Sequence, residues 1–338
     1  MRKKHFLFAS VLALLCGSST LHAQDFKLTS SGYFKNQGVD VMAFDDIYPE
    51  GHQGGVCIIM NGHRVATNGD IRLEATPGQW QPVPKQLDRK LGDNSITATL
   101  CYPDSSRHLT GFNPMIYPDL HLIYTVNVES KGKNIEVTVD LDRPIPQEFI
   151  GKVGFNLEFF PGSLFGKPWI MDGQSGIFPQ QPNSPLMTTQ PNYLHTGNYH
   201  DGKKSLADMD KLIGKGYSPI VADDIISEPY AKGTKFTSRP DDPYNKVTIE
   251  SLSGDLQLFD GRMNHNNGWF VLRSNIKPGV TKGAVKWIIT PNVVADWMYQ
   301  PVIQTSQIGY HPTQDKEAVI EMDIRDNRKE TAQIIRID

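Results

Sequence analysis

The chain has 338 residues, of which 38% are hydrophobic and 21% are charged, and its formal net charge is -3 at pH 7. Basic and acidic residues are interspersed without a basic block, which argues against a nucleic-acid partner and favours a neutral or weakly charged one. After the first 23 residues, no segment is apolar for long enough to cross a membrane.

Residues 1–23 have the pattern of a secretory signal peptide. Basic residues in the first four positions precede an apolar run at 6–15, which is too short to span a bilayer, and Leu21-His22-Ala23 is a plausible cleavage site before Gln24. A lipid anchor on Cys16 is the alternative, but Leu15 is not the small residue that such a motif needs. We therefore expect an exported protein, located in the periplasm, on the cell surface or in the medium.

Short runs of alternating apolar and polar residues recur through the rest of the chain. They lie at residues 56–60, 63–67, 71–75, 96–100, 122–128, 135–141, 153–159, 246–251, 255–259, 269–273 and 284–290. Asn61-Gly62 suits the tight turn of a hairpin, and Asn68-Gly69 is expected to lead into a further strand. The pattern predicts an all-β fold, a large antiparallel β-sandwich with less than about 12% helix, against the usual third.

We expect this sandwich to occupy residues 24–300 as one domain, although two smaller sandwiches joined near 190–215 would also fit. The one helix-like stretch is 205–213. Residues 161–200 are rich in proline, glycine and aromatic residues, which indicates either functional loops or a surface wrap. Cys57 and Cys101 could form a disulfide or remain as buried thiols.

The segment 303–319 reads as two strands joined by a Gly-Tyr-x-Pro turn and a polar connection. It resembles the start of the immunoglobulin-like domain that precedes the catalytic barrel in glycoside hydrolase family 9, the cellulases and related β-glucanases. The matching positions are Gln307, Gly309, Tyr310, Pro312, Lys316, Ala318 and Val319. A complete sandwich of this type has about 100 residues, so the resemblance implies that 301–338 is a truncated immunoglobulin-like β-sandwich.

The family's catalytic residues lie in the α-helical barrel, and neither its Asp-Ala-Gly-Asp-like motif nor such a barrel occurs here. The resemblance thus carries over no catalytic residue and no cofactor. It implies a non-catalytic N-terminal part of an exported β-glucan- or cellulose-degrading hydrolase. The expected partners are a β-glucan polysaccharide or oligosaccharide and the catalytic barrel of the same polypeptide.

Other chemistry is weakly signalled. Gly173 to Gly176 is one residue short of a nucleophile elbow. His195 and His200 beside Asp201 have spacing that could hold a metal, but solvated histidines are the simpler interpretation, and we expect no metal site. Oxygen-rich turns lack the regular spacing of a calcium loop, and adjacent aspartates point to opposite faces of a strand. These groups are Asp255, Asp260, Asn264, Asn266 and Asn267, and the pairs Asp45-Asp46, Asp223-Asp224 and Asp241-Asp242.

A sugar ring is recognised by flat aromatic faces bordered by polar groups that bond its hydroxyls. Trp80 and Trp169 lie beside turn residues and Trp269 at a strand entrance, so these three are the carbohydrate-binding candidates. Trp287 lies in an apolar strand and is expected in the core, while Trp297 completes the set of tryptophans.

Two alternatives to the accessory-domain interpretation stay open. The chain could be a stand-alone carbohydrate-binding β-sandwich, which would present exposed, coplanar tryptophans. Residues 24–300 could instead be an enzyme in their own right, a sandwich-type glycosidase or lyase. That function requires two carboxylates, or a base and a cation, to converge on one cleft, which sequence spacing does not reveal.

Overall fold

The computed structural model describes residues 25–45, 54–73, 84–102, 120–181, 186–188, 225–263 and 268–328, together with 333 and 335. Within them the helical segments are three single 3-10 turns, η2 (Gln147–Phe149), η3 (Pro161–Ser163) and η5 (Gly261–Met263). The prediction of an all-β sandwich with little helix is confirmed. No helix in this part of the chain is long and apolar enough to cross a membrane.

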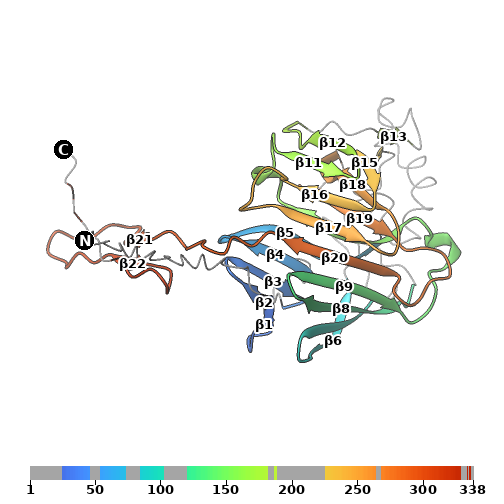
Figure 1. Cartoon of the computed structure of the whole chain (residues 1–338), viewed down its shortest axis with the longest axis horizontal. Coiled ribbons are helices and arrows are strands. Elements are labelled where there is room, and N and C mark those ends of the chain that lie inside the picture. Colours follow the sequence, from blue (N-terminus) through green and yellow to red (C-terminus); the bar gives the residue numbers. More distant parts are fainter. Residues whose placement is uncertain are drawn as a thin grey trace, which may run out of the picture.

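Two large antiparallel sheets make up the sandwich, each with nine strands in the described part of the chain (Figure 1). In spatial order, the first sheet contains β1 (Lys27–Leu28), β2 (Phe34–Asn36), β3 (Val39–Ala43), β4 (Val56–Met60), β5 (His63–Leu73), β10 (Val153–Phe159), β19 (Phe270–Asn275), β18 (Leu256–Asp260) and β15 (Ala231–Gly233). The second contains β12 (Gln174–Ile177), β11 (Pro168–Met171), β16 (Lys235–Ser238), β17 (Val247–Ser251), β20 (Val285–Pro291), β9 (Asn134–Leu141), β8 (Ile123–Lys131), β7 (Ser95–Cys101) and β6 (Lys85–Leu91). Two separate two-stranded sheets pair β13 (Leu186–Thr188) with β14 (Ile225–Ser227) and β21 (Val302–Gln304) with β22 (Val319–Glu321).

The core lies between the two sheets. Alternate residues of β7, β8, β9 and β20 are buried, as expected for strands with one apolar face. Trp287 is fully buried, as its apolar strand predicts, and it packs edge-to-face on Phe155 of the first sheet at a centroid distance of 5.0 Å. Its indole N–H donates to Ser274 Oγ at 3.0 Å, so the ring fills the core without an unsatisfied donor.

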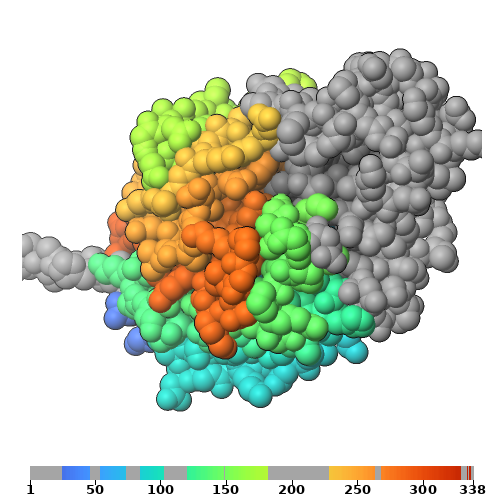
Figure 2. All heavy atoms as spheres, turned by 90° about the vertical axis from the view of Figure 1, so that its right-hand side faces the viewer, coloured from blue at the N-terminus to red at the C-terminus, as the bar shows by residue number. Residues whose placement is uncertain are grey.

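Both sheets contain strands from before and after residues 190–215. β5 and β19 flank β10 in the first sheet, and β9 and β17 flank β20 in the second. Figure 2 shows one end of the sandwich, where the orange segment after β19 lies beside the green segment before β10. There Ile276 N–H donates to Val153 O at 3.0 Å, and Leu141 N–H donates to Thr281 O at 2.7 Å. Residues on both sides of positions 190–215 thus pair within the same two sheets.

The two Asn-Gly pairs have different structures. Asn61 and Gly62 both have positive φ, 52° and 82°, and form the predicted turn between β4 and β5. Asn68 and Gly69 do not form a turn. They lie in a bulge inside β5, which continues to Leu73. The expectation of a second turn was wrong because a positive φ is also adopted in β-bulges, where one strand has an extra residue.

The segment 161–200 has more regular structure than the sequence indicated. It contains β11 and β12, whose connecting turn includes Asp172 and Gly173, so the Gly173 to Gly176 motif belongs to an ordinary β-hairpin. Asp172 accepts hydrogen bonds from the backbone N–H groups of Thr234 and Lys235 at 2.7 and 3.0 Å, which ties this hairpin to β16. The candidate helix at 205–213 lies outside the described residues. Cys57 and Cys101 lie in different sheets, and no disulfide joins them.

Asp70 is a buried carboxyl at the point where β5 extends beyond β4. Its Oδ1 accepts hydrogen bonds from the Tyr124 hydroxyl at 2.9 Å and from the Ile71 N–H at 2.7 Å. The Arg72 guanidinium lies 4.0 Å from Oδ2. Burial raises the pKa of Asp70 to about 6, although Arg72 and the Tyr124 hydrogen bond act in the opposite direction. The folded chain therefore keeps the proton of this carboxyl to a higher pH than the unfolded chain does.

We expect the free energy of unfolding to fall as the pH rises from about 4 to 6, because the pKa of Asp70 is higher in the folded than in the unfolded chain. The Asp70→Asn variant keeps an acceptor for Tyr124 without the charge. Its free energy of unfolding, relative to that of the native chain, should therefore increase by roughly 2–3 kcal/mol between pH 4 and pH 7. Urea unfolding at four pH values measures this. Asp241→Asn, at an exposed carboxyl, is the control, and parallel profiles for Asp70→Asn and the native chain would contradict the prediction.

The hairpin of β21 and β22 projects from the end of the sandwich that carries β1–β4 (Figure 1). Its strands are exposed at every position, and apolar side chains lie on its surface, including Ile303 at 64% and Ile308 at 99% exposure. Side chains that stay exposed contribute little to stability, and a two-stranded hairpin is at best marginally stable by itself. We therefore expect the β21–β22 hairpin to be less stable than the sandwich.

Limited proteolysis with a protease of broad specificity should therefore cut first between Tyr299 and Gln304. The large fragment should then resist further cleavage, because its strands are held in two nine-stranded sheets. Mass spectrometry of the products over time locates the first cut. Equal resistance along the whole chain, at a protein concentration too low for association, would show that the hairpin is as stable as the sandwich.

Candidate functional site

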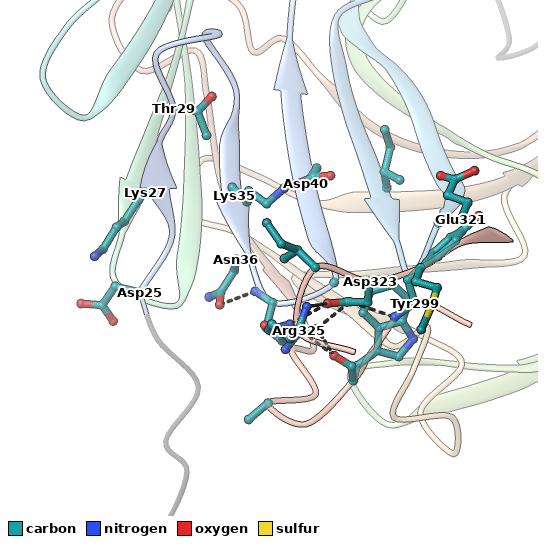
Figure 3. Close-up of a pocket in the computed structure, with 18 residues that line it drawn as sticks. Asp25, Lys27, Thr29, Lys35, Asn36, Asp40, Tyr299, Glu321, Asp323 and Arg325 are labelled. Atoms are coloured by element: carbon teal, nitrogen blue, oxygen red, sulfur yellow. Dashed lines mark hydrogen bonds and ion pairs between the residues drawn. The ribbon is translucent and has the colours of Figure 1, made fainter. Parts of the chain in front are cut away.

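A cleft of about 690 Å³ lies between the β1–β3 edge of the first sheet and the chain that follows β20 (Figure 3). Its volume is in the range of small-molecule sites, which are usually concave and combine apolar walls with a few polar groups. The residues that line it are Asp25, Lys27, Thr29, Lys35, Asn36, Gln37, Gly38, Asp40, Ile59, Gly62, Ala295, Trp297, Tyr299, Glu321, Met322, Asp323, Ile324 and Arg325.

Two aromatic rings form part of the wall. Trp297 and Tyr299 are partly exposed, with ring centroids 6.4 Å apart and planes at 75°. Trp297 lies directly on the backbone of Gly38, where a Cβ atom would be 2.7 Å from Cε3 of the indole. Gly38 has φ +65° in the turn between β2 and β3, so glycine serves both the turn and the close approach of the ring.

Hydrogen bonds hold this part of the chain in place. The Trp297 carbonyl accepts from the Gln37 side chain and, at 2.6 Å, from the Arg325 guanidinium. Arg325 also contacts Asp323 at 2.8 Å, and Asp323 accepts from the Tyr299 N–H at 3.0 Å. The side-chain hydrogen bond from Arg325 and the backbone N–H groups of Tyr299 and Arg325 hold the pKa of Asp323 well below its usual range. The end of the β21–β22 hairpin is thus joined to the aromatic wall by a charged group.

Asp40 provides an acceptor that no described donor satisfies. Its Oδ1 is buried without a hydrogen-bond partner, and the nearest cation, Lys35 Nζ, is 4.0 Å away, beyond hydrogen-bond distance. Burial raises the pKa of Asp40, and Lys35 opposes that rise. In Figure 3, Asp40 and Lys35 lie next to each other on the sheet side of the cleft. A hydroxyl group of a ligand would satisfy this oxygen.

Trp169 and Trp269, two of the three tryptophans predicted from the sequence, do not line this cleft. Trp80 is outside the described residues. Trp169 was expected to be exposed, but it is 6% exposed and packs so closely on Gly176 that a Cβ there would be 2.5 Å from its ring. Trp269 is half-buried and packs edge-to-face on Phe160 at 4.4 Å. The expectation for Trp169 failed because a turn residue next in sequence says nothing about which sheet lies over the ring.

The other sequence candidates do not form a centre within the described part of the chain. No group of three or more His, Cys, Asp or Glu side chains there could hold a metal ion. Asp260 is instead hydrogen-bonded to Arg262 and Tyr230, and Asp242 caps the turn at Tyr244 and Asn245. The candidates His195, His200, Asp201, Asp46, Asp223, Asp224, Asn264, Asn266 and Asn267 fall outside the described residues.

No protein-family model matches the sequence, and no curated protein is significantly similar to it. Among solved structures, the Slr1438 protein from Synechocystis sp. PCC 6803 aligns over 86% of this chain and 100% of its own, with 10% identity and a TM-score of 0.35. A galactose mutarotase related enzyme from Lactobacillus acidophilus aligns over 76% and 96%, with 9% identity and a TM-score of 0.32. A heparan sulfate lyase from Pedobacter heparinus aligns over 86% and 40%, with 11% identity and a TM-score of 0.27. Similarities this weak carry no argument about fold or function.

Replacing Gly38 by alanine should displace Trp297, because the new methyl group would overlap the indole ring. We expect a loss of about 1–2 kcal/mol from the positive φ alone, together with a red shift of tryptophan emission as the ring becomes exposed. Gly151→Ala is the matched control, since Gly151 has φ +80° but no atom lies within 4 Å of its Cβ position. If both variants lose stability and neither shifts the emission, the ring does not depend on Gly38.

Proposed function

We propose that this protein binds a neutral carbohydrate, a β-glucan chain or oligosaccharide, in the cleft beside Trp297. The observation that carries the proposal is the pairing of two partly exposed aromatic rings with the unsatisfied oxygen of Asp40 in one cleft. Aromatic faces pack against sugar rings, while carboxylate and amide groups bond hydroxyls. The near balance of charge along the chain agrees with an uncharged ligand.

We further propose that the chain is the exported, non-catalytic N-terminal part of a β-glucan-degrading hydrolase of the family 9 type. Val319 begins β22, and the other residues of the resemblance lie in the connection between β21 and β22. The Tyr310 hydroxyl accepts from the Ser306 N–H at 3.1 Å and donates to the Glu317 carbonyl. Lys316 donates to the carbonyls of Pro312 and Gln314 at 3.0 and 2.7 Å. Through these contacts Tyr310 and Lys316 hold the backbone of the connection in place, which supports the resemblance.

A stand-alone carbohydrate-binding sandwich is the second candidate. The cleft serves that role equally well, because the residues that form its aromatic wall belong to this chain. The two candidates differ in the partner: an accessory region would bind the catalytic barrel through the β21–β22 hairpin, whose apolar side chains are exposed. Adding a family 9 barrel in trans and measuring association with the intact and hairpin-deleted chains distinguishes them.

Calorimetry with cellohexaose and affinity electrophoresis with mixed-linkage β-glucan test the binding proposal. Trp297→Ala should weaken binding at least about tenfold, because removal of a central aromatic anchor commonly costs more than 1.4 kcal/mol. Trp269→Ala, at a half-buried tryptophan away from the cleft lining, should leave the affinity unchanged. The isolated chain should release no reducing sugar from either glucan above a heat-killed control. Binding that depends on Trp269 and not on Trp297 would refute the cleft as the site.

A further inference from the structure

The three central strands of the first sheet are buried on both faces. Every residue of β10, and every residue of β5 from Val65 onward, is buried. In β19 the same holds for all positions except Asn275. In β9 and β20 of the second sheet, buried and partly exposed residues alternate instead, as expected where one face meets the core and the other meets solvent. The outer face of the central strands is therefore enclosed.

Polar and charged side chains occupy this enclosed outer face. Phe155 points at Trp287 of the second sheet, so the alternation of β10 directs Asn156 and Glu158 to the opposite side. Arg273 of β19 is the direct partner of Asn156 in the pairing register and donates to its Oδ1 at 2.9 Å. Asn156 is fully buried, Arg273 is 2% exposed and Glu158 is 4% exposed.

Gly154 makes room for the guanidinium. A Cβ atom at Gly154 would lie 2.8 Å from Nε of Arg273, so the arginine side chain lies flat across this glycine. From there it donates to the Lys152 carbonyl and to Asn275 Oδ1, each at 2.8 Å. The cation is thus held against the sheet in a fixed orientation beside Asn156.

Asn68 adds the observation that indicates a ligand. It lies in the bulge of β5 with φ +55°, and its amide N–H donates to Glu158 Oε2 at 2.6 Å. This contact fixes the orientation of the amide, which leaves Oδ1 buried with no donor. Asn68 is only 7% exposed. A buried acceptor without a donor costs about 1–3 kcal/mol, so this oxygen calls for a donor from outside the described residues, such as a water or a ligand hydroxyl.

Burial of a carboxylate and a guanidinium costs several kcal/mol unless both are well paired, and Glu158 and Arg273 have the hydrogen bonds given above. Asn68 Oδ1 is the acceptor beside them that no donor among the described residues satisfies. We propose that the outer face of β5, β10 and β19 around Asn68, Asn156, Glu158 and Arg273 is a second binding site, which takes an uncharged ligand rich in hydroxyl groups, such as a single saccharide unit. Arg72 and Asp70 of β5, the register partners of Gly154 and Asn156, add a second buried pair of opposite charges, so the charges of these strands balance, which favours a neutral ligand. One ligand hydroxyl donates to Asn68 Oδ1. The Asn156 amide, the Glu158 carboxylate and the Arg273 guanidinium form hydrogen bonds with the neighbouring hydroxyls of the ligand. This site is separate from the cleft beside Trp297 and does not depend on it.

The test uses the full chain carrying Trp297→Ala, which removes the proposed cleft site. Calorimetry with glucose, galactose, xylose and cellobiose should still show one binding event per chain for at least one sugar. Adding Glu158→Gln, which keeps the acceptor for Asn68 but removes the charge, should weaken that event at least about tenfold. Glu136→Gln is the matched control, because Glu136 lies in β9 of the second sheet, paired with Lys286 at 3.3 Å, and it should bind as the parent does.

Asn68→Gly is the second variant, since glycine adopts the same positive φ and removes the unsatisfied oxygen. It should also abolish the event, and thermal melts should show both variants folded at the assay temperature. Absence of binding to all four sugars in the Trp297→Ala chain, or binding unchanged by both variants, overturns the proposal. Binding that persists with the cleft removed supports this site even if cellohexaose binding proves independent of Trp297, so the two proposals fail separately.

Discussion

The contact between Trp287 and Phe155 joins the two sheets. The rest of the structure depends on this packing of one sheet against the other. The ring of Trp287 is fully buried and lies edge-on to Phe155, and its N–H reaches Ser274. This contact determines which residues of β10 face the core. Because side chains alternate along a strand, the same contact places Asn156 and Glu158 on the opposite face. Packing in the core thus determines where the polar groups of the outer face lie.

The enclosed outer face is unusual for a two-layer sandwich. Apolar side chains would fill it with less desolvation, and charged groups there stabilise the fold only when each has partners. The structure supplies such partners through close backbone approaches: Gly154 lets Arg273 lie across the sheet, and the bulge at Asn68 brings an amide to Glu158. Asp70 is likewise buried away from water, which raises the pKa of its carboxyl, and the Tyr124 hydroxyl is its hydrogen-bond partner.

The cleft beside Trp297 has a different physical origin. It forms where a segment that has left the second sheet returns across the edge of the first, and the contact of its indole with Gly38 is possible because glycine has no side chain there. Arg325 links the hairpin to the same carbonyl that Gln37 contacts. Anything that moves the hairpin relative to the sandwich therefore also moves the aromatic wall, which couples whatever binds the hairpin to the shape of the cleft.

The sequence by itself determined the fold class, because alternation with a period of two and the Asn61-Gly62 turn are local patterns that depend on neighbouring residues alone. It also indicated the core position of Trp287 and the turn around Tyr310. Only the tertiary structure decided the rest. Asn68-Gly69 became a bulge because β10 pairs beside it, and Trp297 became a wall residue because Gly38, 259 positions earlier, lies beneath it. Such long-range pairings leave no periodic pattern in the sequence, since each depends on the register of distant strands.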